Sequence, residues 1–219
     1  MANQDSFIDE VTEDLRRDRL FALMRRYGWI AILAVLLIVG GAAWNEWRKA
    51  TAQAEAERLG DAIIAALETE DPAARRAALE VVDTSGRPDL AALVGLLTAG
   101  ADIEGGDLAA TLSTLDALAA SPEASPLLRD LAALKAVMAG GPTMSPDERI
   151  TRVQGLALPG APYRLLALEQ IALAEIDRGN VEAALDRLNE ISADSTASQG
   201  LRNRATQLIV VLGGAPDGA

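Results

Sequence analysis

The sequence predicts an all-α protein with a single N-terminal transmembrane helix, followed by an α-solenoid built of short helix pairs. Three observations in the 219-residue chain support this fold class. Ala and Leu are abundant and aromatic residues make up only 3% of the chain, a composition that favours helices over sheets. One long apolar run stands near the N-terminus. The remainder contains an internal repeat of the length expected for helix pairs.

The apolar run extends from Tyr27 to Trp47 and reads YGWIAILAVLLIVGGAAWNEW. Its central part has no charged or strongly polar side chain, but at ~1.5 Å per residue that part alone covers only about 24 Å. With its flanks, the run reaches the hydrocarbon thickness of roughly 30 Å. Amphipathic aromatic rings suit the headgroup level. Residues 27–47 are therefore predicted to form a transmembrane helix, with its ends marked by Tyr27, Trp29, Trp44 and Trp47.

The basic residues around this span predict its orientation. Five arginines lie in the twenty positions before it, and three basic residues lie in the twenty after it. This bias places residues 1–26 in the cytoplasm and residues 48–219 on the other side of the membrane. A cleaved signal peptide, with Gly41 and Ala43 near the cleavage site, is the competing interpretation. We favour a retained anchor, because the 26 residues before the run carry acids as well as arginines, unlike a short basic leader.

The segment 1–26 is predicted to be an amphipathic helical tail. Its apolar residues recur at near-helical spacing, and its acids precede its arginines, an order that suits the helix dipole. Two interpretations stay open. The tail either docks onto another membrane protein or lies on the membrane surface and fixes the topology, and we favour the second.

Charge and composition exclude several classes of function. The chain has a formal net charge of -12 and contains neither cysteine nor histidine. We therefore expect no nucleic-acid partner, no thiol or imidazole chemistry, no metal, no cofactor and no small-molecule substrate. Acid pairs such as Asp186/Glu190 and Glu175/Glu182 are interpreted as solvated helix faces, because no calcium-binding loop accompanies them. Likewise, no Gly-Lys-Ser/Thr follows the Gly-Gly pairs, which we expect to be turns.

Beyond the span, Gly, Pro, Asp and Ser separate short helical segments. We expect helix pairs over 50–83, 88–120, 126–157 and 161–192, with a capping helix over 197–212. Residues 106–141 align without a gap on residues 179–214, with 13 of 36 positions identical. The offset of 73 residues is about twice the ~34-residue tetratricopeptide period. The repeats are thus tetratricopeptide-like, although Leu168, Glu175, Val181 and Leu188 stand where the consensus prefers aromatic residues.

Two arginines, Arg129 and Arg202, occupy equivalent places in the aligned segments. They are the candidate partner-binding residues, because a pair of guanidinium groups could clamp a peptide carboxylate. The alternative, which we favour, is a salt bridge from each arginine to a neighbouring acid within its own repeat.

The whole pattern resembles the YfgM-like ancillary subunits of the SecYEG translocon, which share a tetratricopeptide-like domain with cell-division coordinator proteins. The resemblance rests on a tail ending RRYGW, a span reaching WNEWRKA, the helix TAQAEAERLGDAIIAALE, and the segment APYRLLALEQIALAEIDRGNVEAALDRLNEI followed by LRNRA. It implies a single-pass protein of the bacterial inner membrane with a periplasmic helical domain. Its implied partners are the Sec translocon and a membrane-anchored chaperone of the prolyl-isomerase type.

Function is expected to be binding rather than catalysis. A stack of helix pairs provides a curved surface for partner proteins and carries no chemistry of its own. An enzyme using carboxylates alone would need a pocket with two tuned acids, for which the sequence gives no sign. The alternative is a membrane-anchored structural or assembly scaffold, for example in envelope or cell-division coordination, that acts through its tail and span.

Overall fold

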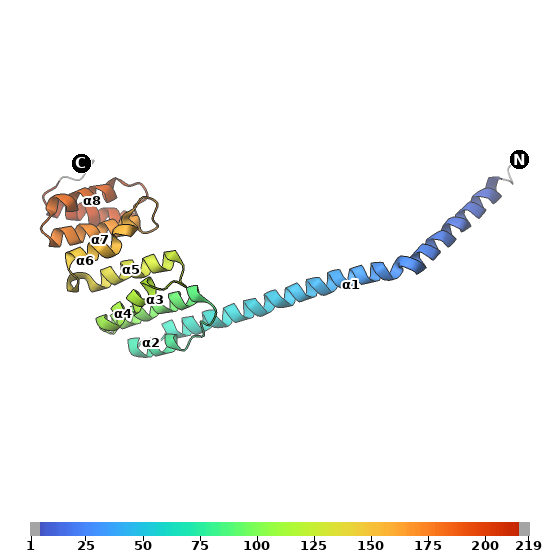
Figure 1. The fold of residues 1–219 in the computed structure, drawn as a ribbon, viewed down its shortest axis with the longest axis horizontal. Coiled ribbons are helices and arrows are strands. Elements are labelled where there is room, and N and C mark those ends of the chain that lie inside the picture. The colour runs from blue at the N-terminus through green and yellow to red at the C-terminus, as the bar shows by residue number, and fades with distance from the viewer. Residues whose placement is uncertain (1–4, 215–219) are drawn as a thin grey trace. The chain divides into compact units, whose positions relative to one another are not determined.

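A computed structural model describes residues 5–214, apart from the side chains of 5–24, 27, 28 and 31. These residues form helices and no strand, which confirms the predicted all-α class. The first helix, α1, spans Asp5–Leu67. The helices that follow, stacked in chain order in Figure 1, are α2 (Pro72–Glu80), α3 (Pro88–Glu104), α4 (Leu108–Ala119), α5 (Pro126–Gly140), α6 (Pro146–Val153), α7 (Arg164–Asp177), α8 (Val181–Ala193) and α9 (Gln199–Val211). Two short 3₁₀ turns, Gly141–Thr143 and Gln154–Ala157, flank α6.

The chain divides into two compact units, residues 1–58 and residues 59–219. Helix α1 accounts for the described part of the first unit and ends inside the second. The predicted repeat domain begins at residue 48, whereas the compact unit begins at Leu59. The last turns of α1 join the core of the second unit through Ile63 and Ala66, which pack with Leu79 and Val94.

The predicted span falls within α1. Among the residues that the structure describes, no helix combines the length and the apolar character required to cross a membrane. The side chains of Tyr27, Gly28 and Ala31 lie outside those described residues, as do the side chains of 5–24 in the predicted tail. The transmembrane helix at 27–47 and the amphipathic tail stay predictions.

Helix starts in the second unit follow from local sequence. The Asp71 carboxylate accepts from the amide of Ala74 at 2.7 Å, and the Ser145 hydroxyl accepts from the amide of Glu148 at 3.2 Å. Proline follows each of these capping residues at the first helical position, where a missing amide hydrogen costs nothing. The capping side chain and the proline together therefore fix the first residue of each of these helices.

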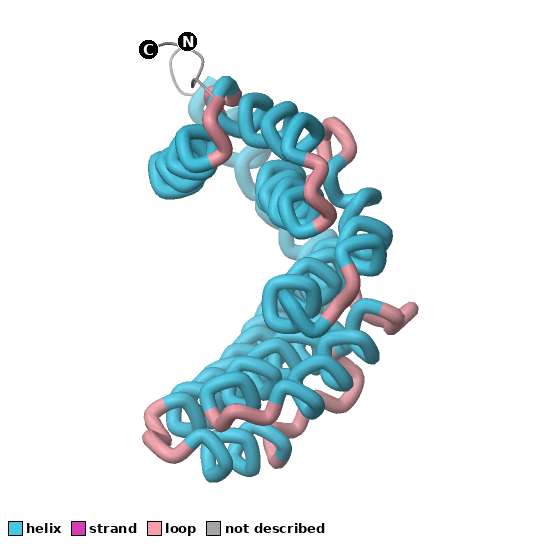
Figure 2. Tube along the Cα trace, turned by 90° about the vertical axis from the view of Figure 1, so that its left-hand side faces the viewer, coloured by secondary structure: helices cyan, strands magenta, loops and turns pink. Residues whose placement is uncertain are grey.

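The packing confirms the predicted helix pairs 88–120 and 161–192. Helix α3 packs on α4 and α7 packs on α8, and each pair contacts the helix that follows it. Ala172 on α7 and Ala184 on α8 are fully buried, and their small side chains let the paired helices approach closely. Between neighbouring pairs lie clusters of buried aliphatic side chains, such as the one that joins Leu168, Leu188 and Ile209. In Figure 2 the helix pairs of the second unit follow a curve.

The internal repeat is visible in the backbone as well as in the sequence. Gly106 and Gly179 end α3 and α7 with φ angles of 79° and 76°, in the left-handed region that favours glycine. The next amides donate to equivalent carbonyls: Asp107 to Asp102 and Asn180 to Glu175, both at 2.8 Å. The aligned residues therefore form the same turn.

The correspondence also extends upstream of the aligned segments. Arg75 on α2 forms an ion pair with Glu104 on α3, and Arg149 on α6 forms the matching pair with Asp177 on α7. Leu79 and Val153, each four residues after its arginine, are both fully buried. Helices α2 to α5 and helices α6 to α9 are thus two copies of one four-helix arrangement.

Two glycine substitutions should have opposite effects on stability. Gly179→Ala places a Cβ in open space but at φ 76°, so we expect a loss of about 1 kcal/mol in the free energy of unfolding. Gly100→Ala, within α3 and also in open space, should raise it by about 0.5 kcal/mol. Urea denaturation measures both. Equal effects of the two substitutions would contradict the turn geometry.

Candidate functional site

The leading helices of successive pairs, α3, α5, α7 and α9, line two neighbouring cavities. We call these cavities together the leading-helix groove. The first, of about 690 Å³, is lined by α5, α7 and α9, and the second, of about 320 Å³, by α3, α4 and α5. Met138 on α5 lines both, and its side chain is 54% exposed. An exposed methionine at this junction provides an adaptable apolar contact.

The larger cavity combines apolar walls with one strong ion pair. Its apolar side chains come from three helices: Met138, Leu173, Leu208 and Val211. The Glu169 carboxylate is buried, and both of its oxygens accept from Arg204, at 2.7 and 2.9 Å. The hydrogen bonds and the charge of Glu169 raise the pKa of Arg204 above its ordinary value. The two groups neutralise each other, so the wall presents a fixed polar edge beside an apolar surface.

The smaller cavity has a different charge pattern. Ile103 is 47% exposed beside Gly100, and Lys135 reaches the same cavity from α5. Glu104 also lines it, and its carboxylate is held by Arg75. Apolar walls with a few convergent polar groups suit the binding of a peptide segment.

Sequence reasoning did not find these groove residues. Met138 and Val211 are equivalent at the 73-residue offset, and both are exposed apolar residues shortly before a glycine. That shared position was the available signal. From the sequence, these two exposed positions cannot be distinguished from core positions, because the residues next to them, Val137 and Val210, are apolar as well.

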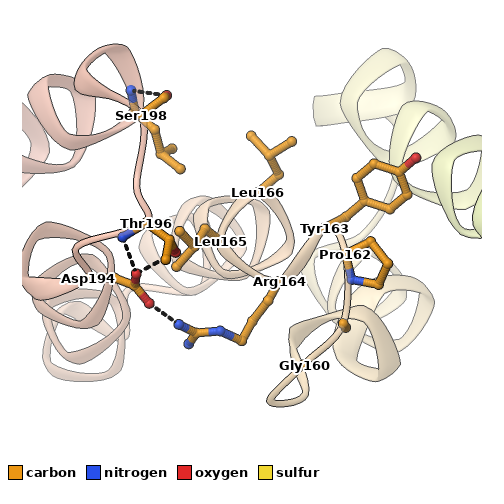
Figure 3. Close-up of a pocket in the computed structure, with 11 residues that line it drawn as sticks. Gly160, Pro162, Tyr163, Arg164, Leu165, Leu166, Asp194, Thr196 and Ser198 are labelled. Atoms are coloured by element: carbon orange, nitrogen blue, oxygen red, sulfur yellow. Dashed lines mark hydrogen bonds and ion pairs between the residues drawn. The ribbon is translucent and has the colours of Figure 1, made fainter.

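A third cavity, shown in Figure 3, is formed by the start of α7 and the loop before α9. Arg164 forms ion pairs with Glu190 and Asp194. The Asp194 carboxylate also accepts from the amide of Thr196 at 2.7 Å and from its hydroxyl at 2.5 Å. These bonds lower the pKa of the Asp194 carboxyl, assisted by the positive charges of Arg164 and Arg202. The ionised form therefore stabilises the fold, and that contribution is lost as the pH falls through the lowered pKa.

The candidate residues Arg129 and Arg202 have closely matching surroundings. Arg129 donates to the carbonyl of Ser121 at 3.4 Å, and Arg202 donates to the carbonyl of Asp194 at 3.3 Å, eight residues earlier in both cases. Arg202 also donates to the carbonyl of Ala197 at 3.1 Å. We expected each arginine to form a salt bridge within its own repeat. Instead, each guanidinium group donates to main-chain carbonyl oxygens and so holds the loop before its helix in place. Partner binding by either arginine stays a prediction.

The predicted anchor ends are exposed where the structure describes them. The side chains of Trp29, Trp44 and Trp47 are 62%, 61% and 58% exposed. The rings of Trp44 and Trp47 lie together, with centroids 5.2 Å apart. Tyr27 lies outside the residues whose side chains are described.

One member of each acid pair named from the sequence forms an ion pair with an arginine. Glu190 pairs with Arg164 and Arg187, and Glu175 pairs with Arg178. Across the described part of the chain, no group of three or more acidic side chains is arranged to hold a metal ion.

Comparison with known proteins agrees with this architecture. Residues 24–139, more than half of the chain, match the family described as the tetratricopeptide repeat-like domain. The chain belongs to this family. No curated protein matches the chain, and no solved structure matches it. Residues 140–214 lie beyond the family match, but α6 to α9 repeat the arrangement of α2 to α5. Tetratricopeptide repeat-like domains are scaffolds for protein–protein interaction, and the leading-helix groove is the surface that suits this role here.

Replacing Arg202 tests whether it fastens its loop or binds a partner. Arg202→Ala removes the bonds to the Asp194 and Ala197 carbonyls, so we expect the free energy of unfolding to fall by about 1–2 kcal/mol. Arg187→Ala is the matched control, because Arg187 makes only a surface ion pair. Thermal unfolding measures both variants. An unchanged melting temperature together with weaker partner binding would instead support a carboxylate clamp.

Proposed function

We propose that this protein is a membrane-anchored, non-enzymatic binding module. Its helical repeat domain engages a segment of a partner protein along the leading-helix groove. The observation that carries the proposal is Met138, a half-exposed apolar side chain shared by two adjoining cavities. The absence of cysteine and histidine from the chain removes the commonest nucleophiles and general bases, which favours binding over catalysis.

The membrane anchor is proposed at residues 27–47. Large apolar side chains in this segment, including Ile32, Leu37 and Ile38, are 64–71% exposed. An exposed apolar run of this size is unfavourable in water, and it is typical of a segment that a membrane or another protein covers. The paired rings of Trp44 and Trp47 suit the headgroup level at the end of the span. The excess of arginines before the span supports a cytoplasmic N-terminus, with the helical domain on the other side of the membrane. From the resemblance to YfgM-like proteins, we propose that this membrane is a bacterial inner membrane and that the domain is periplasmic.

The partners are proposed from the resemblance to YfgM-like proteins. They are the Sec translocon and a membrane-anchored chaperone of the prolyl-isomerase type, and the protein would act as an ancillary subunit that links the two. The helical repeat domain supports this role, because it offers a groove for a protein segment. The competing proposal is a structural or assembly scaffold, in which the tail and the span make the contacts and the groove is incidental.

Deletions distinguish the two proposals. If the repeat domain binds the partners, removal of residues 50–219 should abolish crosslinking to the translocon and the chaperone in gently solubilised membranes. Removal of residues 1–26 should leave it unchanged. Crosslinked partners are identified by mass spectrometry, with membrane insertion of each variant as the control. Crosslinking that survives loss of the domain, or disappears with the tail, would support the scaffold.

A further inference from the structure

The two copies of the four-helix arrangement differ where their leading helices line the groove. Three apolar residues of α7 and α9 line the larger cavity: Leu173, Leu208 and Val211. Their counterparts at the 73-residue offset all line the smaller cavity: Gly100, Lys135 and Met138. The register is the same in both copies, since the neighbouring alanines Ala99 and Ala172 are both buried. The first copy thus has a glycine and a lysine where the second copy has two leucines.

Lys135 is a cation without an acid partner among the residues that the structure describes. It is the only lysine after residue 49, and it is half-buried on α5. No hydrogen bond or ion pair joins it to any described residue. Glu104 lines the same cavity, but its carboxylate pairs with Arg75. The cation of the larger cavity differs, because Arg204 is bound by both oxygens of the Glu169 carboxylate.

The smaller cavity also contains space that the described chain does not fill. A Cβ atom added at Gly100 would meet no atom within 4 Å. Glycine is less favourable than alanine inside a helix such as α3. Because no described contact requires this glycine, its small size suits the close approach of a ligand to the backbone. Ile103, which is 47% exposed, gives the same space an apolar wall.

A carboxylate is the group that complements this cavity. The stem of Lys135 can lie along the apolar lining while its ammonium group turns toward a ligand. An ion pair formed there is partly shielded from water, which makes it stronger than a pair on an open surface. However, residues 59–214 carry 12 Lys and Arg against 22 Asp and Glu, so a strongly acidic segment would be repelled. A single carboxylate in an otherwise neutral or basic segment fits best.

We propose that the smaller cavity is a subsite for the side-chain carboxylate of an Asp or Glu in the partner segment that the groove binds. The carboxylate pairs with Lys135, and the apolar residues beside it lie against Ile103 and Met138. Because Met138 lines both cavities, the segment continues into the larger one, which favours an internal side chain over a chain end. The subsite rests on the proposed function of the groove and adds the chemistry of its ligand.

A library of random peptides displayed on phage tests the subsite without a known partner. The peptides are fused through their C-terminal ends, so they present no terminal carboxylate. They are selected on the full-length protein in nanodiscs, after clearance on empty nanodiscs. We expect the selected peptides to carry one Asp or Glu between apolar residues. A selected peptide, synthesised with an amidated C-terminus, should bind about tenfold more weakly to Lys135→Met, which keeps the stem and removes the charge.

The matched control is Arg187→Met on α8. It removes the same charge from a position outside both groove cavities, so binding should be unchanged. Replacing the acid of the peptide with its amide should weaken binding to the wild-type protein about tenfold, with little further loss on Lys135→Met. Selection on Lys135→Glu should instead yield peptides with Lys or Arg at that place. Circular dichroism confirms that each variant is folded.

The outcomes separate the subsite from the proposed function of the groove. Equal weakening by Lys135→Met and Arg187→Met, or full additivity of Lys135→Met with the amide change, would overturn the subsite. Selected peptides that lack an acid but are lost with Met138→Gln would overturn it and leave the groove as the binding surface. Peptides unaffected by Met138→Gln, or no selected peptides at all, would contradict both. Binders found only in a second library with free C-termini would assign the cavity to a terminal carboxylate instead.

Discussion

The structure depends on close packing between helices, which small residues make possible. The helix pairs pack on the helices that follow them, and fully buried alanines lie in these contacts: Ala132, Ala136, Ala167, Ala172, Ala184 and Ala205. A larger side chain at these positions would separate the helices and open the clusters between them. Because each helix pair is stabilised by contacts with its neighbours, the same four-helix arrangement can occur twice in one chain with the same kinds of contacts.

Repetition also explains where uncovered apolar side chains occur. Leading helices recur along the stack, so the positions that they leave uncovered recur too, and Met138 and Val211 are two instances of one position. Arginines are largely used to join helices: Arg75 and Arg149 pair with acids on the next α-helix, and Arg204 on α9 pairs with Glu169 on α7. The remaining acids give the domain its negative charge, which disfavours nucleic acid and favours basic partners.

Much of this fold could be predicted from residues whose effects are local. Asp71 and Ser145 fix helix starts through their own side chains, and Gly106 and Gly179 fix turns through their backbone freedom. The groove could not be predicted, because an apolar residue such as Met138 carries the same sequence signal whether it is buried or exposed. Likewise, the sequence identified Arg129 and Arg202 as equivalent, but only the path of the preceding loop decides that they bind carbonyls.

The central claim is that the leading-helix groove, rather than the tail or the outer surface, contacts the partner. Photo-crosslinking from single positions of the full-length protein in native membranes tests it most directly. A photoreactive residue at Met138 should give products with a translocon or chaperone subunit, whereas one at Val81, which is 82% exposed at the end of α2, should not. Equal products from both positions, or products from Val81 alone, would contradict the account.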